Sequence, residues 1–239
     1  MKKIVISMLF TSLMFIAAAQ KEIINDPNVE LRTINGSFTS IKISGGIDLF
    51  LSQSDNEALA VSATEDKYKE SIKTIVENNT LKIYYFGDKN WNNTKNKNCR
   101  VYVSFKNLEM ITASGACDVQ VAGIISGSAL TLNLSGASDF KGAVNLTDLK
   151  LGLSGASDVT IKGVATSVEI ESTGASDVKG YDLITDFCNA KASGASDINI
   201  TVNKQLNATA SGASDIYYKG NAAIKEMHTG GASSINKKG

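Results

Sequence analysis

Arginine is nearly absent from this 239-residue chain, and aromatic residues are few. Arg32 and Arg100 are its two arginines, and phenylalanine, tryptophan and tyrosine together make up 7% of the sequence. Proteins that bind nucleic acids normally carry a stripe of basic side chains, and those that bind single strands also present aromatic platforms. The composition therefore argues against nucleic acid as a partner.

Cysteine is also scarce. Cys99, Cys117 and Cys188 are too few for a disulfide scaffold and too scattered for a zinc site. Their odd number means that at least one is free or paired with another molecule, and the spacing does not say which. We expect no cofactor and no resident metal.

After residue 20 the sequence lacks an apolar run long enough to cross a membrane. Before that point, Lys2 and Lys3 precede an apolar run over 4–16, and three alanines precede Gln20. These features are typical of a secretory signal peptide, which we place at residues 1–19. We therefore expect export to the periplasm or cell surface, with no transmembrane segment left after cleavage.

The sequence does contain one repeated phrase, Gly-Ala-Ser-Asp followed by an apolar residue, which occurs seven times with small variations. Its successive glycines are 21, 19, 19, 20, 18 and 19 residues apart. A period near 20 residues is typical of a solenoid, in which coils bury their apolar faces by stacking. The glycines are Gly115, Gly136, Gly155, Gly174, Gly194, Gly212 and Gly231.

We interpret each phrase as a corner. The residue after the glycine is always alanine, and three positions later it is always apolar, as in Ala156 and Val159. We expect both to point inward, which requires a bend between them. Glycine tolerates a positive φ there, and serine and aspartate can hydrogen-bond amides that a turn leaves unpaired. The alanines are Ala116, Ala137, Ala156, Ala175, Ala195, Ala213 and Ala232.

The approach to each glycine alternates between apolar and polar residues, as in Leu130, Leu132 and Leu134. This period of two predicts strands with one buried face and argues against a helical solenoid, as do the 20 glycines. We therefore predict an all-β fold, a right-handed single-stranded parallel β-helix over residues 108–239. One coil should take about 19–20 residues and contain several short strands.

Residues 20–107 lack the phrase but should be an irregular β-rich part continuous with the solenoid. The segment 44–48, SGGID, is a degenerate copy of the phrase. We expect a short helix over 65–76, and an exposed loop around Trp91. Strands are predicted around Ile41–Ile43, Ile47–Leu51, Leu81–Ile83 after an Asn78-Asn79 turn, and Val101–Phe105.

The opening RTINGSFTSIKISGGIDLFLSQ, residues 32–53, and the serial SGASD corners together resemble a known family. Its members are exported β-helix proteins of Bacteroidota described as putative auto-transporter adhesins with a head GIN domain. The resemblance covers nearly all of the mature chain and implies a right-handed β-helix with an adhesion-like role. Gly46-Ile47-Asp48 stands where the family name has Gly-Ile-Asn. The resemblance supplies no catalytic residues.

The aspartates of the phrase should stack in one column about 4.8 Å apart, where like charges repel by about 1 kcal/mol in water. Hydrogen bonds from corner amides and serines, a bound proton or a calcium ion could each offset this repulsion. We favour hydrogen bonds, since the calcium signature G-G-x-G-x-D is missing. The column consists of Asp118, Asp139, Asp158, Asp177, Asp197 and Asp215.

Catalysis on a β-helix wall needs an irregular locus where acidic and basic groups converge. Here the carboxylates recur on every coil, and no nucleophile motif accompanies His228, the single histidine. We therefore expect a non-enzyme, a scaffold or adhesin-like binding module for glycans or envelope proteins. The alternatives are a polysaccharide lyase or hydrolase and a self-assembling subunit that forms homo-oligomers.

Overall fold

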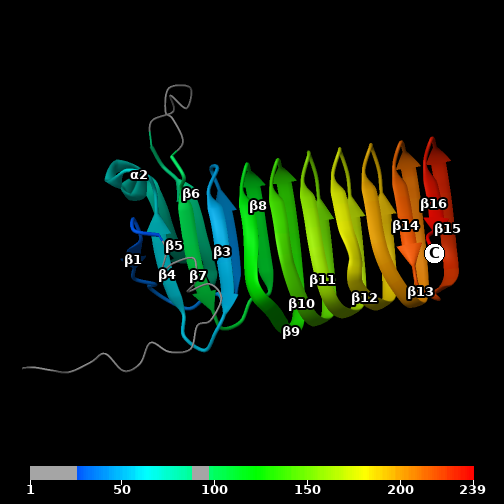
Figure 1. Cartoon of the computed structure of the whole chain (residues 1–239), viewed down its shortest axis with the longest axis horizontal. Coiled ribbons are helices and arrows are strands. Elements are labelled where there is room, and N and C mark those ends of the chain that lie inside the picture. The colour runs from blue at the N-terminus through cyan, green and yellow to red at the C-terminus, as the bar shows by residue number, and fades with distance from the viewer. Residues whose placement is uncertain (1–25, 88–96) are drawn as a thin grey trace, which may run out of the picture.

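The computed structural model describes residues 26–87 and 97–239, which form a rod of stacked β coils (Figure 1). The proposed signal peptide and most of the predicted loop around Trp91 lie outside the described residues. No helix in the described part is long and apolar enough to cross a membrane.

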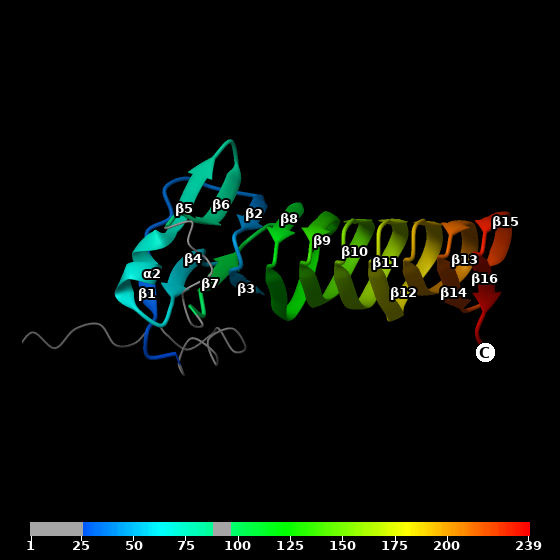
Figure 2. The ribbon, with the colours of Figure 1, turned by 90° about the horizontal axis from the view of Figure 1, so that it is seen from above.

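The regular part of the rod is built from five long strands that each turn around the axis (Figures 1 and 2). We expected several short strands per coil, but the hydrogen-bonded ladder continues around the bends and each coil is a single bent strand. All pairings between these strands are parallel. They are β9 (Asp118–Gly136), β10 (Asp139–Leu153), β11 (Asp158–Ser172), β12 (Asp177–Ala192) and β13 (Asp197–Gly212).

Three further strands complete the far end of the rod. The strand β14 (Asp215–Lys219) pairs with the start of β13, and β15 (Ala223–Gly231) pairs with its end. The strand β16 (Ser234–Lys237) then lies on β14. The predicted β-solenoid is therefore confirmed along the whole repeat region.

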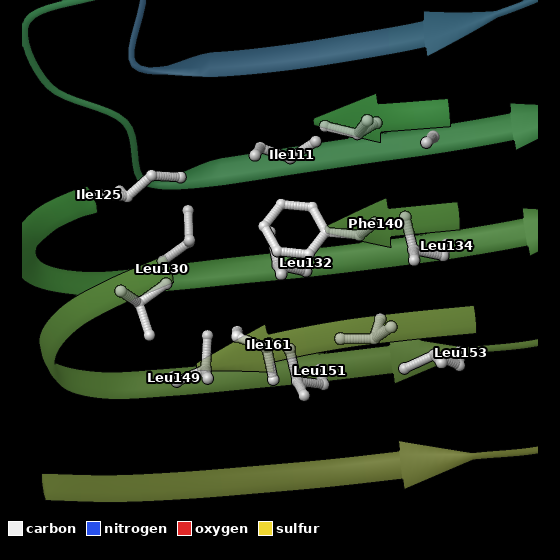
Figure 3. Packing of buried hydrophobic residues seen from close by; sticks show 14 of the residues in the cluster. Ile111, Ile125, Leu130, Leu132, Leu134, Phe140, Leu149, Leu151, Leu153 and Ile161 are labelled. Carbon is white, nitrogen blue, oxygen red and sulfur yellow. The ribbon is translucent and has the colours of Figure 1, made fainter. Parts of the chain in front are cut away.

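Period-two alternation builds the core. Leu130, Leu132 and Leu134 point inward from β9, and Leu149, Leu151 and Leu153 repeat the arrangement one coil further on (Figure 3). Burial of one leucine side chain contributes about 1.5–3 kcal/mol, so each coil is stabilised mainly by its neighbours. Phe140 fills the centre of the section shown in Figure 3 and is 1% exposed.

The solenoid extends into the irregular N-terminal part. The strands β2 (Ser40–Ser44) and β3 (Asp48–Gln53) flank the SGGID corner and stack on β8 (Met110–Gly115) and β9. On their other side lie β6 (Thr80–Tyr85) and β7 (Arg100–Phe105), also parallel. The strands predicted from residues 41–51, 81–83 and 101–105 are thus confirmed, and SGGID is a true corner.

Antiparallel strands cover the outer edge of this end. The strand β4 (Ala58–Ser62) pairs with β7, β1 (Glu30–Arg32) pairs with β4, and β5 (Ile72–Glu77) pairs with β6 through the turn at Asn78 and Asn79. Both asparagines have positive φ, 49° and 59°. Exposed parallel edges invite further strand pairing, and these antiparallel strands occupy them.

The helix predicted over 65–76 is too long. The helix α2 (Asp66–Ser71) ends where β5 begins at Ile72. Residues 72–76 read Ile-Lys-Thr-Ile-Val, and such β-branched residues favour a strand when a partner edge is present. The edge of β6 therefore decides the structure of this segment.

Candidate binding faces

The seven corner glycines all have positive φ, between 75° and 94°, and are stacked along the rod. A Cβ on Gly155 would lie 2.5 Å from the carbonyl oxygen of Gly136. The same oxygen accepts a hydrogen bond from the N–H of Ala156 at 2.7 Å. From Gly136 to Gly231 glycine is therefore required for two reasons, its conformation and the close approach of the preceding coil, whereas at Gly115 the positive φ alone requires it.

The expectation that the corner alanines point inward is wrong. All seven alanines are exposed, and the serine that follows is buried instead in the five phrases from the second to the sixth. The inward alternation starts at the serine and continues to the apolar residue after the aspartate, so the bend precedes the serine. Ser138, Ser157, Ser176, Ser196 and Ser214 are each 0% exposed.

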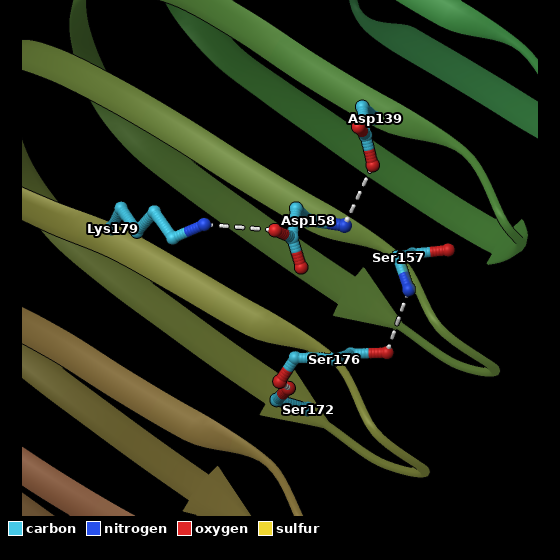
Figure 4. Close-up of polar contacts among 6 residues, drawn as sticks. All are labelled: Asp139, Ser157, Asp158, Ser172, Ser176 and Lys179. Carbon is cyan, nitrogen blue, oxygen red and sulfur yellow. Dashed lines mark hydrogen bonds and ion pairs between the residues drawn. The ribbon is translucent and has the colours of Figure 1, made fainter.

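Buried hydroxyls need hydrogen-bond partners, and the serine file supplies them internally. The Ser176 hydroxyl accepts a bond from the N–H of Ser157 at 3.2 Å (Figure 4), and the Ser157 hydroxyl donates to the carbonyl of Ser154 at 3.1 Å. In the first phrase Cys117 replaces serine, and its thiol donates to the carbonyl of Ser114 at 3.3 Å. The predicted hydrogen bonding by corner serines is confirmed.

The aspartates form the predicted column on the outer surface. Asp139 is in register with Asp118, and the file continues through Asp158, Asp177 and Asp197. Beyond Asp197 the file continues through Asp215 to Ser234. Before Asp118 it continues through Asp48 to Arg100. The structure therefore lengthens the column beyond the six predicted residues, with a hydroxyl at one end and a guanidinium at the other.

Neighbouring groups offset part of the charge. The N–H of Asp158 donates to Oδ1 of Asp139 at 3.2 Å, and Nζ of Lys179 lies 2.8 Å from Oδ2 of Asp158 (Figure 4). Hydrogen bonds from the Ser234 and Tyr217 hydroxyls, at 2.6 and 2.9 Å, lower the pKa of Asp215. Local hydrogen bonds therefore act on this column as predicted.

The negative charges of Asp48, Asp118 and Asp197 are offset less well by their neighbours. Burial, followed by the charge of Asp118, raises the pKa of Asp48, although Arg100 opposes this. Burial and the charge of Asp139 likewise raise the pKa of Asp118. Burial also raises the pKa of Asp197. Among the described residues, no group of three or more histidine, cysteine, aspartate or glutamate side chains is arranged to hold a metal ion.

A groove of about 680 Å³ lies beside the aspartate face and was not anticipated from the sequence. We call it the bend groove; it is lined by Gln120, Val121, Gly123 and Ile124, by residues 141–143 and 160–163, and by Asp182. It arises because in-register strands take different numbers of residues around one bend. From Gln120 to Ser126 β9 takes six residues, whereas β10 takes four between their partners Lys141 and Asn145.

The unequal periods of the repeat are the sequence signal for this groove. The 21-residue period reflects the extra residues in the bend of β9, and the 20-residue period reflects one extra residue in β12 before Ile184. The shorter bends of β10 and β11 lie between these two bulges. The shorter bends of β10 and β11 therefore form the floor of the groove, and the longer bends of β9 and β12 form its two banks.

A second face is formed by the later halves of the same strands, and we call it the polar wall. Its outward residues lie in two files that carry hydroxyl, amide and charged groups at every position except Gly152, with ion pairs between Lys150 and Glu169 at 3.2 Å and between Lys191 and Glu171 at 3.3 Å. One file is Thr131, Lys150, Glu169, Asn189 and Asn207. The other is Asn133, Gly152, Glu171, Lys191 and Thr209.

The remaining candidate side chains do not converge on a site. Cys99, Cys117 and Cys188 are free and buried. Burial raises the pKa of Cys188 to about 12, which disfavours a reactive thiolate. His228 lies on β15 in register with Thr209, at the end of the second file of the polar wall.

Fold and surface together define a parallel β-solenoid with stacked glycine corners, a regular acidic face and a flat polar wall. The chain belongs to the family described as "Putative auto-transporter adhesin, head GIN domain", whose model matches residues 37–222. It is thus an adhesin-like β-solenoid. No curated protein matches the sequence.

Solved structures from Bacteroidota share this fold. A putative adhesin from Bacteroides fragilis has a TM-score of 0.79 at 21% identity, covering 89% of this chain and 98% of that chain. A protein named a putative lipid binding protein, from Parabacteroides distasonis, has a TM-score of 0.67 at 21% identity, with 90% and 98% covered. Another putative adhesin from P. distasonis has a TM-score of 0.70 at 19% identity, with 88% and 97% covered.

Proposed function

We propose that this protein is an exported, non-catalytic binding module of the cell envelope that recognises extended glycans along the polar wall. The observation that carries the proposal is the register of the wall. Five successive coils place hydroxyl, amide and charged side chains in two straight files, interrupted at Gly152, at the strand spacing of about 4.8 Å. An extended polymer with regularly spaced hydroxyl groups can hydrogen-bond to such a surface.

The chemistry of the wall supports a carbohydrate over an apolar partner. Asn189 and Thr209 are exposed, and each offers a donor and an acceptor. The two ion pairs hold Lys150 and Lys191 across neighbouring coils, which limits the entropy lost when a ligand binds. Family membership supports an adhesin-like rather than an enzymatic role.

A glycan array with the purified protein tests the proposal. We expect binding to a restricted set of extended glycans and its loss in Asn189→Arg, which places bulk at the centre of the wall. The matched control is Asn199→Arg, the same change on the aspartate face, where Asn199 neighbours Lys179. If no glycan binds, or if both variants bind equally, the polar wall is not a glycan site. Shortening of the bound glycan during the assay would point to an enzyme instead.

A further inference from the structure

We propose that the bend groove binds a single-chain anionic amphiphile, an acyl chain that ends in a carboxylate. Its volume of about 680 Å³ falls within the range of about 300–1,000 Å³ that is usual for small-molecule sites. The groove lies on a different face from the polar wall, so this proposal does not depend on glycan binding.

The groove offers an apolar surface that the rest of the aspartate face lacks. Ile124 on the β9 bank is 56% exposed, although isoleucine is normally buried, and Val121 beside it is half-buried. Gly142 brings the β10 backbone close to β9, because the space that a Cβ there would occupy is filled by the Phe140 ring and the Val121 side chain, each 2.9 Å away. An acyl chain lying along the groove would cover Ile124 and the exposed part of Val121 together.

The charges along the groove select the head group. Lys141 on β10 and Lys162 on β11 both line it, are exposed, and make no ion pair or hydrogen bond within the described residues. By contrast, Lys150 on β10 and Lys179 and Lys191 on β12 each pair with a carboxylate. A ligand carboxylate can therefore approach Lys141 and Lys162 without breaking an existing contact.

The position of Asp182 determines at which end of the groove the anionic head group lies. This exposed carboxylate lines the groove from β12, on the bank opposite Val121 and Ile124. Repulsion from Asp182 on one side, and from Asp139 two residues before Lys141 on the other, confines the anionic head to the space between Lys141 and Lys162, while the chain extends toward Ile124. An uncharged or cationic head group would lose the contribution of the two lysines.

The probe is laurate, titrated into the purified protein below its critical micelle concentration and followed by calorimetry. We expect saturable binding at one site, and at least tenfold weaker binding of dodecyltrimethylammonium. Lys141→Gln combined with Lys162→Gln should weaken laurate binding about tenfold, which is about 1.4 kcal/mol. Lys150→Gln combined with Lys191→Gln on the polar wall is the control and should leave laurate affinity unchanged.

A second pair of variants tests the apolar part. Ile124→Asp should weaken laurate binding at least tenfold, whereas Ile184→Asp should not, because Ile184 is 48% exposed on β12 but does not line the groove. Both residues face outward, so the fold should survive each change, as circular dichroism would verify. The proposal is overturned if laurate binding never saturates, if control and groove variants weaken it equally, or if the protein binds only phosphatidylglycerol vesicles and no monomeric laurate.

Discussion

At the scale of single residues, the corner is held by a glycine that no other residue replaces without strain. Each of the six corner glycines from Gly115 to Gly212 presents its carbonyl to the N–H of the alanine one coil further on, at 2.7–2.8 Å. The two backbones approach so closely that a methyl group has no room between them. One residue type therefore fixes both the turn and the spacing of the coils.

Substitution of one corner glycine should therefore be costly. Gly155→Ala must accept φ of +83° and place its Cβ 2.5 Å from the Gly136 oxygen. We expect a loss of about 2–4 kcal/mol from backbone strain and overpacking. This loss corresponds to a fall in Tm of about 5–10 °C, measurable by thermal unfolding.

The matched control is Gly127→Ala. Gly127 has no positive φ, and the nearest atom to its added Cβ, Cδ2 of Leu146, would be 3.9 Å away. This change should leave Tm within about 2 °C of the wild-type value, since surface substitutions of this kind cost about 0.5 kcal/mol or less. Equal losses in the two variants would show that the corner is not specifically constrained.

The serine file gives a second prediction. Ser157→Ala removes the acceptor for the N–H of Ser138 and the donor to the carbonyl of Ser154. A buried N–H left without a partner costs about 1–3 kcal/mol. Ser157→Cys should lose less than half as much, because the thiol of Cys117 makes the corresponding bond in its own corner. Chemical denaturation of both variants, with Ser154→Ala as an exposed control, measures the difference.

At the scale of strands, the aspartate file combines paired and unpaired carboxylates. Asp118 lies between Asp48 and Asp139, both acidic, whereas Asp158 has Lys179 beside it. Asp118→Asn should therefore raise Tm at pH 7 by about 1–2 °C, because a solvent-screened like-charge contact is worth less than about 1 kcal/mol. Asp158→Asn should lower Tm slightly, since it removes the partner of Lys179.

The pH dependence of that gain follows from the raised pKa of Asp118. A carboxyl group whose pKa is higher in the folded than in the unfolded state destabilises the fold once it is ionised. The destabilisation is present above the folded pKa and disappears as the pH falls through it and below the ordinary value of 3.8. The advantage of Asp118→Asn should therefore vanish near pH 3, and a gain that persists there would exclude charge repulsion as its cause.

The strands also show how far sequence reasoning extends. The period of 19–20 residues and the alternation at Leu130, Leu132 and Leu134 were enough to predict stacked parallel coils. Alternation did not reveal which residue of the phrase points inward, because Ala and Ser are both small and both tolerate a corner. The bend groove was missed because the spacings of 18 to 21 residues were interpreted as a single period near 20 rather than as longer bends in β9 and β12.

At the scale of the molecule, the irregular N-terminal part has a structural reason. The strands β4 and β5 run antiparallel to β7 and β6 and cover the edges of the coil that these two strands form. Composition alone could not place them, since the predicted helix over 65–76 and the strand β5 compete for the same residues. The segment that starts at Ile72 forms a strand because the edge of β6, which follows it across a hairpin turn, pairs with it.

The identity of successive corners makes the rod modular, and removal of one whole coil tests this. Deletion of residues 156–174 joins Gly155 to Ala175 and leaves an unbroken Ser-Gly-Ala-Ser-Asp corner. Because each coil contacts mainly its two neighbours, the shortened chain should fold with the same β spectrum and a modestly lower Tm. Deletion of residues 213–231, also 19 residues long, joins Gly212 to Ala232 in the same way and is the control.

The two deletions should differ in ligand binding. The first removes β11 and with it Thr160 and Lys162 from the groove, so laurate affinity should fall at least tenfold. The second leaves every groove residue in place and should retain that affinity. If the first deletion unfolds the protein while the second does not, the coils are not interchangeable units. If both fold and bind laurate equally, the site lies outside the bend between β9 and β12, because only the first deletion changes that bend.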